Sequence, residues 1–124
     1  MSIGDVPTVF IVDDDAGVRE SIHDLVESVS LHAESFATAQ GFLSSERRDS
    51  PSCLVLDVRL PDASGLDLQQ ELSRAGVRIP IIFITGHGDE KMRLQALRAG
   101  AVEFLSKPFD DEILLDSVRA AMSN

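Results

Sequence analysis

The chain has 124 residues, of which 44% are hydrophobic and 26% are charged, as expected for one soluble globular domain spanning residues 1–124. Its formal net charge of −10 argues against direct binding to nucleic acid, and no apolar run approaches the roughly 20 residues that a membrane helix needs. The N-terminal residues lack a secretion signal, so we expect a cytoplasmic protein.

Apolar runs of strand length alternate with segments of helical periodicity along the whole chain. The predicted strands, in chain order, are residues 8–12, 32–36, 53–56, 81–85 and 102–106. The predicted helices are residues 18–29, 38–45, 66–74, 90–98 and 111–122. Because each strand leads into a helix and parallel strands need crossover connections, the sequence predicts an α/β fold with a doubly wound, five-stranded parallel sheet and helices on both faces.

Polar residues stand at the carboxyl ends of four of these predicted strands. They are Asp13, Asp14 and Asp15 after the first strand, Asp57 after the third, Thr85 at the end of the fourth and Lys107 after the fifth. The carboxyl edge of an open parallel sheet is where ligands bind, near the point where the strand order reverses. We therefore expect these side chains to form one site.

The residue types in this predicted site suit a phosphoryl group and a magnesium ion. Clustered carboxylates repel one another unless they share protons or hold a hard cation, and Mg²⁺ prefers oxygen ligands. Lys107 and the hydroxyl of Thr85 can neutralise and bind phosphoryl oxygens. Asp57, at the centre of the predicted edge, is the expected nucleophile, forming an acyl phosphate.

Each feature also has a simpler interpretation when it is taken alone. An acidic triplet after a strand can cap a helix, which is a role that we expect for Asp15. Pro61 and Gly65 are turn formers, so the segment after Asp57 can be a plain loop. The joint occurrence of these polar residues on four strands favours a functional site.

The motifs FIVDDD, LVLDVRLPDASGLDL, IIFITGHGD and GAVEFLSKPF together resemble the receiver domain of two-component response regulators over nearly the whole chain. ITGHGD and EFLSKPF are typical of the FixJ-type branch, whose receivers precede a helix-turn-helix output domain. The resemblance implies the flavodoxin-like strand order 2-1-3-4-5. It also implies a phosphoprotein that acts as a signalling switch in a phosphorelay, and that assists its own phosphorylation and dephosphorylation without being an enzyme in the usual sense.

The resemblance assigns roles to the acidic residues of the predicted site. Asp57 would accept a phosphoryl group from a phosphohistidine on a sensor histidine kinase. Asp14 and Asp57 would ligate Mg²⁺ directly, together with the backbone carbonyl of Arg59. Asp13 would contribute through a water molecule.

The resemblance also implies a switch. Lys107 would pair with the phosphoryl oxygens, and Thr85 would bond another of them and act with Phe104 as the switch. Phe104 replaces the tyrosine of many members, so its ring must act through packing alone. The expected result is a changed surface on helix 90–98, strand 102–106 and helix 111–122. That change would promote homodimerisation or control a C-terminal DNA-binding domain, and so regulate transcription.

Two further expectations concern backbone geometry and a rival function. A cis bond between Lys107 and Pro108 fits a chain that must turn away while the lysine faces the site.

The rival is a Mg²⁺ phosphatase of the haloacid dehalogenase type, with Asp13 as nucleophile and Asp15 as acid/base. It would leave Asp57 without a role. A flavin carrier is disfavoured further, because the acidic triplet would repel a cofactor phosphate.

Overall fold

The computed structural model describes residues 7–45 and 52–123, which form a parallel sheet of five strands in the order β2-β1-β3-β4-β5. The strands are β1 (Thr8–Val12), β2 (His32–Phe36), β3 (Ser52–Asp57), β4 (Ile81–Thr85) and β5 (Glu103–Ser106). The helices are α1 (Ala16–Glu27), α2 (Ala39–Leu43), α3 (Gly65–Arg74), α4 (Glu90–Arg98) and α5 (Asp111–Met122). The predicted fold class and strand order are confirmed.

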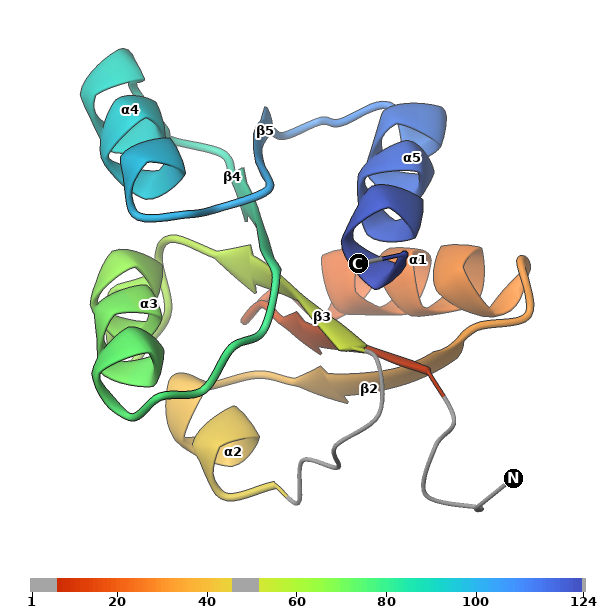
Figure 1. Ribbon diagram of the computed structural model, residues 1–124. Helices are drawn as coiled ribbons and strands as arrows, with labels where there is room; N and C mark the ends of the chain where they lie inside the picture. The colour runs from red at the N-terminus through yellow and green to blue at the C-terminus, as the bar shows by residue number, and fades with distance from the viewer. Residues whose placement is uncertain (1–6, 46–51, 124) are drawn as a thin grey trace.

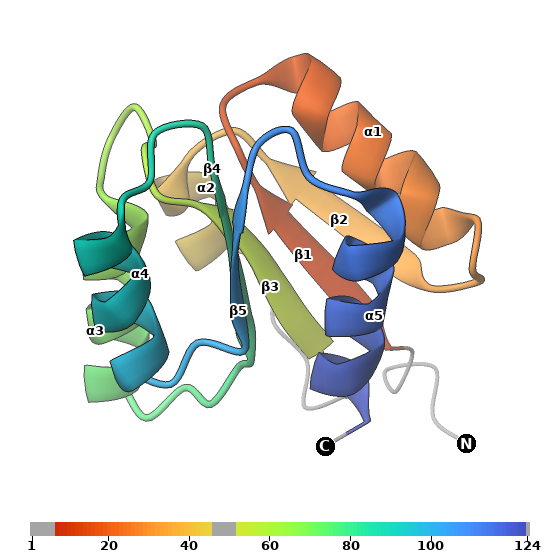
Figure 2. The ribbon, with the colours of Figure 1, turned by 90° about the horizontal axis from the view of Figure 1, so that it is seen from above.

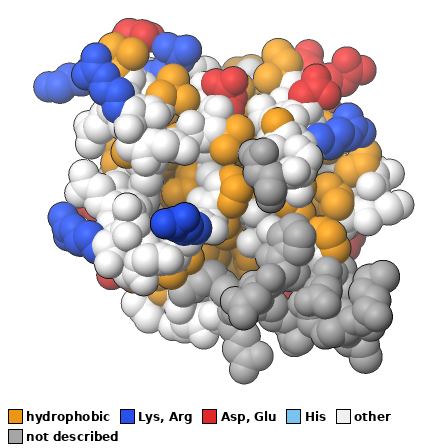
Figure 3. Space-filling view, in the orientation of Figure 1, with side chains coloured by type: hydrophobic (Ala, Val, Ile, Leu, Met, Phe, Trp, Pro, Cys, Tyr) orange, Lys and Arg blue, Asp and Glu red, His pale blue; other side chains and the backbone are white. Residues whose placement is uncertain are grey.

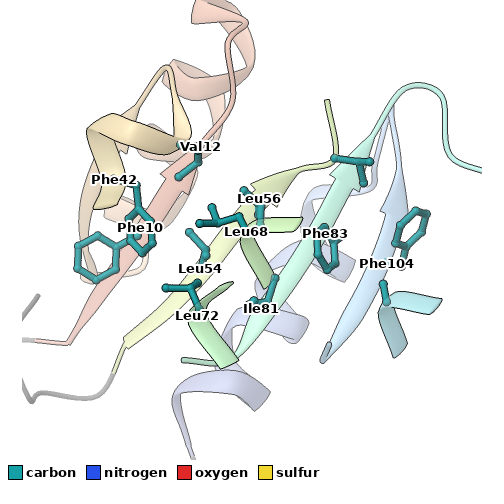
Figure 4. Close-up of a cluster of buried hydrophobic side chains, with 13 residues drawn as sticks. Phe10, Val12, Phe42, Leu54, Leu56, Leu68, Leu72, Ile81, Phe83 and Phe104 are labelled. Carbon is teal, nitrogen blue, oxygen red and sulfur yellow. The ribbon is translucent and has the colours of Figure 1, made fainter. Parts of the chain in front are cut away.

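Helices cover both faces of the sheet, with α1 and α5 on one side and α2, α3 and α4 on the other (Figures 1 and 2). Each face holds its own core. Phe10, Phe42, Leu54, Phe83 and Phe104 belong to the core beneath α2, α3 and α4, which Figure 4 shows. The strands β1, β3 and β4 are buried on both faces, which explains their continuous apolar sequences.

Local signals at the helix ends account for the boundaries. The Asp15 carboxylate accepts hydrogen bonds from the N–H groups of Gly17 and Val18 and so caps α1, as predicted. The apolar periodicity continues to Val29, but α1 ends at Glu27. Ser30 adopts a positive φ of 65°, and the Leu31 N–H returns to the Val26 carbonyl, which closes the helix earlier than its periodicity predicts.

No helix among residues 7–45 and 52–123 has both the length and the apolar character needed to cross a membrane.

Gly65 brings the start of α3 directly against the end of β3. Its N–H donates to the Val58 carbonyl at 2.7 Å, and a Cβ atom at position 65 would collide with the backbone carbonyl oxygen of Asp57. Only glycine allows this approach without a shift of the backbone that carries Asp57. The close packing of α3 on β3 therefore depends on this residue.

We expect Gly65→Ala to lower the free energy of unfolding by about 1–3 kcal/mol, because the added methyl group must displace backbone atoms. Gly86→Ala is the matched control, since a Cβ atom at position 86 meets no atom within 4 Å. The chain contains neither Trp nor Tyr, so unfolding in urea is best followed by far-UV circular dichroism. Equal stability of the two variants would contradict this account of Gly65.

Candidate functional site

The sheet register gathers the predicted site residues at one edge. Val12 of β1 pairs with Leu56 of β3, so the residues that follow them, Asp13 and Asp57, are neighbours. Asp57 pairs in turn with Ile84, which places Thr85 next along β4. Parallel pairing thus aligns the carboxyl ends of strands that are distant in sequence, as the sequence predicted.

Lys107 lies between two carboxylates at the centre of this edge. Its Nζ atom is 2.7 Å from Asp13 Oδ2 and 3.0 Å from Asp57 Oδ2. Asp13 is fully buried and Asp57 is 5% exposed, so both ion pairs are sheltered from water. The Lys107–Pro108 bond is cis, as predicted, and the Lys107 N–H donates to the Thr85 carbonyl at 2.8 Å.

Burial and charge shift the protonation equilibria of Asp13 and Lys107. Burial raises the pKa of the Asp13 carboxyl, the hydrogen bonds from Lys107 and from the Asp15 N–H oppose the rise, and the Asp57 charge adds to it. For Lys107, partial burial acts to lower the pKa, but the bonds and charges of Asp13 and Asp57 outweigh it and raise the pKa of the ammonium. Lys107 therefore remains charged at neutral pH.

The acidic residues offer a suitable cation site. Asp13, Asp14 and Asp57 each provide a carboxylate oxygen, and these oxygens lie within 4.8 Å of one another. Asp14 is exposed while the other two are buried, so a cation can enter from solvent. The Lys107 ammonium faces this cluster, and the all-oxygen donor set suits a hard divalent ion such as Mg²⁺.

The predicted backbone ligand lies in the same region. The Arg59 N–H donates to Asp57 Oδ1 at 3.1 Å, which holds the Arg59 peptide beside the acidic cluster. Arg59 also forms an isolated bridge with Ser64 at the other end of the β3–α3 loop. The loop is thereby closed immediately after Asp57.

Thr85, Phe104 and Gly88 form a packed contact beside the site. Thr85 is 1% exposed, and its hydroxyl oxygen accepts the His87 N–H at 3.2 Å. The Phe104 ring is buried, with its centroid 6.0 Å from that of Phe83 (Figure 4). A Cβ atom at position 88 would come within 2.6 Å of Thr85 Cγ2 and 2.7 Å of Phe104 Cε1, so the loop after β4 touches both side chains.

Sequence reasoning missed two residues that support the site. The Arg19 guanidinium donates to the backbone carbonyl of Asp13 at 2.8 Å and so holds the loop after β1. Asp62, which the sequence indicated only as part of a turn, accepts two N–H groups at the start of α2. An acidic residue in a loop close to Asp57 was the one available signal for Asp62, and nothing in the sequence marked Arg19.

We expect Asp13→Asn to raise the free energy of unfolding by about 1 kcal/mol at pH 7 without divalent cations. The pKa of Asp13 is higher in the folded chain than its ordinary 3.8, so its ionisation opposes folding at neutral pH, and the gain should shrink as the pH falls toward 4. Asp116→Asn, at an exposed carboxylate, is the control and should change little. A destabilised Asp13→Asn protein would mean that the pair with Lys107 outweighs burial.

Comparison with known proteins gives concordant matches. Residues 9–119 match the family described as the response regulator receiver domain. Nodulation protein W of Bradyrhizobium diazoefficiens is 56% identical over 113 residues, which cover 91% of this chain and 50% of that protein. Transcriptional regulatory protein FixJ of Azorhizobium caulinodans is 41% identical over 114 residues, which cover 92% of this chain and 54% of that protein. The chain thus spans about half the length of these curated relatives.

The solved structure of the response regulator StyR superimposes with a TM-score of 0.88 and 46% identity, covering 94% of this chain and 59% of that one. The family match reaches from β1 into α5 and includes every strand whose end contributes to the acidic edge. The chain therefore belongs to the response regulator receiver domain family of two-component signalling, with transcriptional regulators of the FixJ type among its relatives.

Proposed function

We propose that this domain is a phosphorylation-activated switch that accepts a phosphoryl group on Asp57 from a phosphohistidine of a sensor histidine kinase. The observation that carries the proposal is the Lys107 ammonium, which lies within 3.0 Å of Asp57 beside the cluster of three carboxylates. A carboxylate oxygen of Asp57 would attack phosphorus, and the bond from phosphorus to the donor nitrogen would break with its electron pair leaving on the imidazole.

Each neighbouring group has a proposed task in this transfer. Asp14, Asp57 and the Arg59 carbonyl would hold Mg²⁺ directly, with Asp13 contributing through water. The bound cation would supply positive charge to the phosphoryl oxygens. Lys107 would turn from the carboxylates toward a phosphoryl oxygen, and the Thr85 hydroxyl would donate to another.

The geometry gives less support to the rival phosphatase. That mechanism needs Asp15 as a mobile acid/base, but its carboxylate is occupied in capping α1. Asp13, the nucleophile in that reading, is fully buried and bonded to Lys107 at 2.7 Å. Asp57 is 5% exposed and ends the central strand of the sheet, which favours it as the acceptor.

We further propose that phosphorylation acts through the α4–β5–α5 surface and promotes pairing with a second copy. Leu94 on α4 and Ile113 on α5 are the large hydrophobic residues that stand exposed in the described part of the chain, 39% and 51% respectively. Lys and Arg side chains gather over α4, and acidic side chains over the start of α5 (Figure 3). A symmetric dimer can therefore place basic α4 against acidic α5.

The buried Phe104 ring indicates how the switch would operate. The ring is 8% exposed and lies against the loop that carries Gly88, so activation would act through the packing of this ring. It would stabilise one packing of Thr85, Gly88 and Phe104 over alternatives. A preference of about 5.5 kcal/mol moves a two-state population from 1:99 to 99:1, which a few charge-assisted bonds can supply.

The relatives suggest what the switch controls. They are about twice as long as this chain, and FixJ is described as a transcriptional regulatory protein. We propose that the domain regulates transcription through a DNA-binding domain that follows the receiver. The receiver's own net charge of −10 disfavours DNA contact by this domain.

We expect one phosphoryl group on Asp57 after incubation with Mg²⁺ and acetyl phosphate, measured by intact mass and by peptide mapping after hydroxylamine treatment. Asp57→Asn should abolish the product, because the amide is not a nucleophile. Asp67→Asn, at an exposed position in the first turn of α3, is the control and should be labelled like the unchanged protein. Labelling that persists in Asp57→Asn but is lost in Asp13→Asn would favour the phosphatase.

We expect beryllofluoride with Mg²⁺ to shift the domain from monomer to dimer in sedimentation velocity. Arg98→Glu should weaken the dimer because it reverses a charge on α4, and Thr85→Ala should weaken it by uncoupling the site from that surface. Arg74→Glu is the matched control, since Arg74 occupies the same last-turn position on α3. A monomer under all conditions, up to millimolar concentration, would remove dimerisation as the output.

A further inference from the structure

A carboxylate in the β3–α3 loop holds the start of α2. Asp62 Oδ1 accepts the N–H of Ala39 at 3.0 Å, and Asp62 Oδ2 accepts the N–H of Gln40 at 3.0 Å. These partners are 23 and 22 residues away in sequence, so the contact joins the β3–α3 loop to a distant helix. We call this pair of hydrogen bonds the Asp62 clasp. Both bonds are charge-assisted, and their strength lowers the pKa of the Asp62 carboxyl.

The helix does not need the clasp as its own cap. The Thr38 hydroxyl already accepts the Gly41 N–H at 3.0 Å, which is the ordinary side-chain cap of α2. The clasp takes the two remaining N–H groups of the first turn. Its distinctive effect is therefore to attach the β3–α3 loop to α2.

The helix is a firm point of attachment because aromatic packing fixes it on the sheet. The Phe42 ring of α2 lies 5.5 Å from Phe10 of β1 and 5.9 Å from Phe36 of β2, between ring centroids. Phe42 is fully buried, and Figure 4 shows its ring beside Phe10. The position of α2 is thus tied to β1 and β2.

The loop on the other side of the clasp is closed on itself. The Leu60 N–H donates to the Ala63 carbonyl at 3.1 Å, and Arg59 bridges to Ser64 across the loop. Asp62 lies inside this short turn, so hydrogen bonds that hold its carboxylate also restrain the loop. The loop includes the Arg59 peptide, which lies beside Asp57.

From this connection we propose that Asp62 is a positioning residue for the cation site, an inference that rests on the proposed function. The candidate ligands come from two sides of the sheet edge: Asp13 and Asp14 follow β1, whereas the Arg59 carbonyl belongs to the loop after β3. The Asp62 clasp ties that loop to a helix packed on β1. It thereby fixes the spacing between the two ligand groups before a cation arrives.

Preorganisation of this kind matters most for an ion with strict geometry. Mg²⁺ requires near-octahedral oxygen ligands and tolerates displacement poorly. A loop released from α2 would sample other positions, and the bound state would then carry the entropic cost of ordering it. Asp62 would touch neither the cation nor the phosphoryl group and would act through the Arg59 carbonyl.

The test measures Mg²⁺ affinity by isothermal titration calorimetry on the unphosphorylated domain. We expect Asp62→Ala to weaken Mg²⁺ binding about 10-fold, the scale typical of lost supporting contacts around a metal. Asp62→Asn keeps one acceptor oxygen and should lie between Asp62→Ala and the unchanged protein. In the cation-free domain, amide hydrogen exchange at Leu60 and Ala39 should accelerate in Asp62→Ala.

Thr38→Ala is the matched control. It removes the ordinary cap of α2 and lowers stability, but it leaves the clasp in place, so its Mg²⁺ affinity should equal that of the unchanged protein. Phosphoryl uptake from acetyl phosphate gives a second readout. Asp62→Ala should need more Mg²⁺ for half-maximal rate but reach the same rate at saturating Mg²⁺.

The outcomes separate the inference from the function on which it rests. If the unchanged protein neither binds Mg²⁺ nor takes up a phosphoryl group, the proposed function fails. If it does both and Asp62→Ala binds Mg²⁺ equally well, the positioning role is wrong. Equal losses of affinity in Thr38→Ala and Asp62→Ala would also overturn it, because the effect would then come from the stability of α2.

Discussion

Electrostatic imbalance at the carboxyl edge is the constraint on which the rest of this molecule depends. Three carboxylates converge within 4.8 Å, and one ammonium lies within 3.0 Å of two of them. Burial of Asp13 and Asp57 keeps water from screening the charges of these two carboxylates, so the fold must hold them in place against their repulsion. Under the proposed function, a divalent cation would relieve this imbalance, and a phosphoryl group on Asp57 would give Lys107 a new partner.

The parallel sheet is what makes such a gathering possible. Crossover connections return every strand in the same direction, so residues as distant as Asp13 and Lys107 reach one edge. β5 is separated from β3 by β4, yet the long Lys107 side chain spans that distance to Asp57. Gly65 allows α3 to start against Asp57, and Arg19 holds the loop after β1. Residues that hold the backbone of the fold in place, such as Gly65 and Arg19, therefore also position the site.

Sequence patterns predicted the parts of this arrangement that depend on local order. The sequence predicted the strands from their periodicity. It also predicted that the acidic residues after β1 and Asp57 at the end of β3 lie at one edge, because strand direction alone decides where a strand-end residue lies. The sequence could not predict the Asp62 clasp, since it requires a loop and a helix start more than 20 residues apart to meet at hydrogen-bond distance. The burial of Phe104 likewise depends on the approach of Gly88, which no periodicity encodes.

The two ends of α4 make different contacts with the rest of the domain. The buried Gln69 side chain of α3 donates to the Ala96 carbonyl at 3.1 Å, and the Ala101 N–H donates to the same oxygen at 3.0 Å. These bonds anchor the C-terminal end of α4. Its N-terminal end adjoins the loop in which Gly88 touches Thr85 and Phe104. In the proposed switch, a shift of Thr85 would act on the end of α4 that lacks these two bonds, and the helix would pivot about its C-terminus with Phe104 as the contact that must repack.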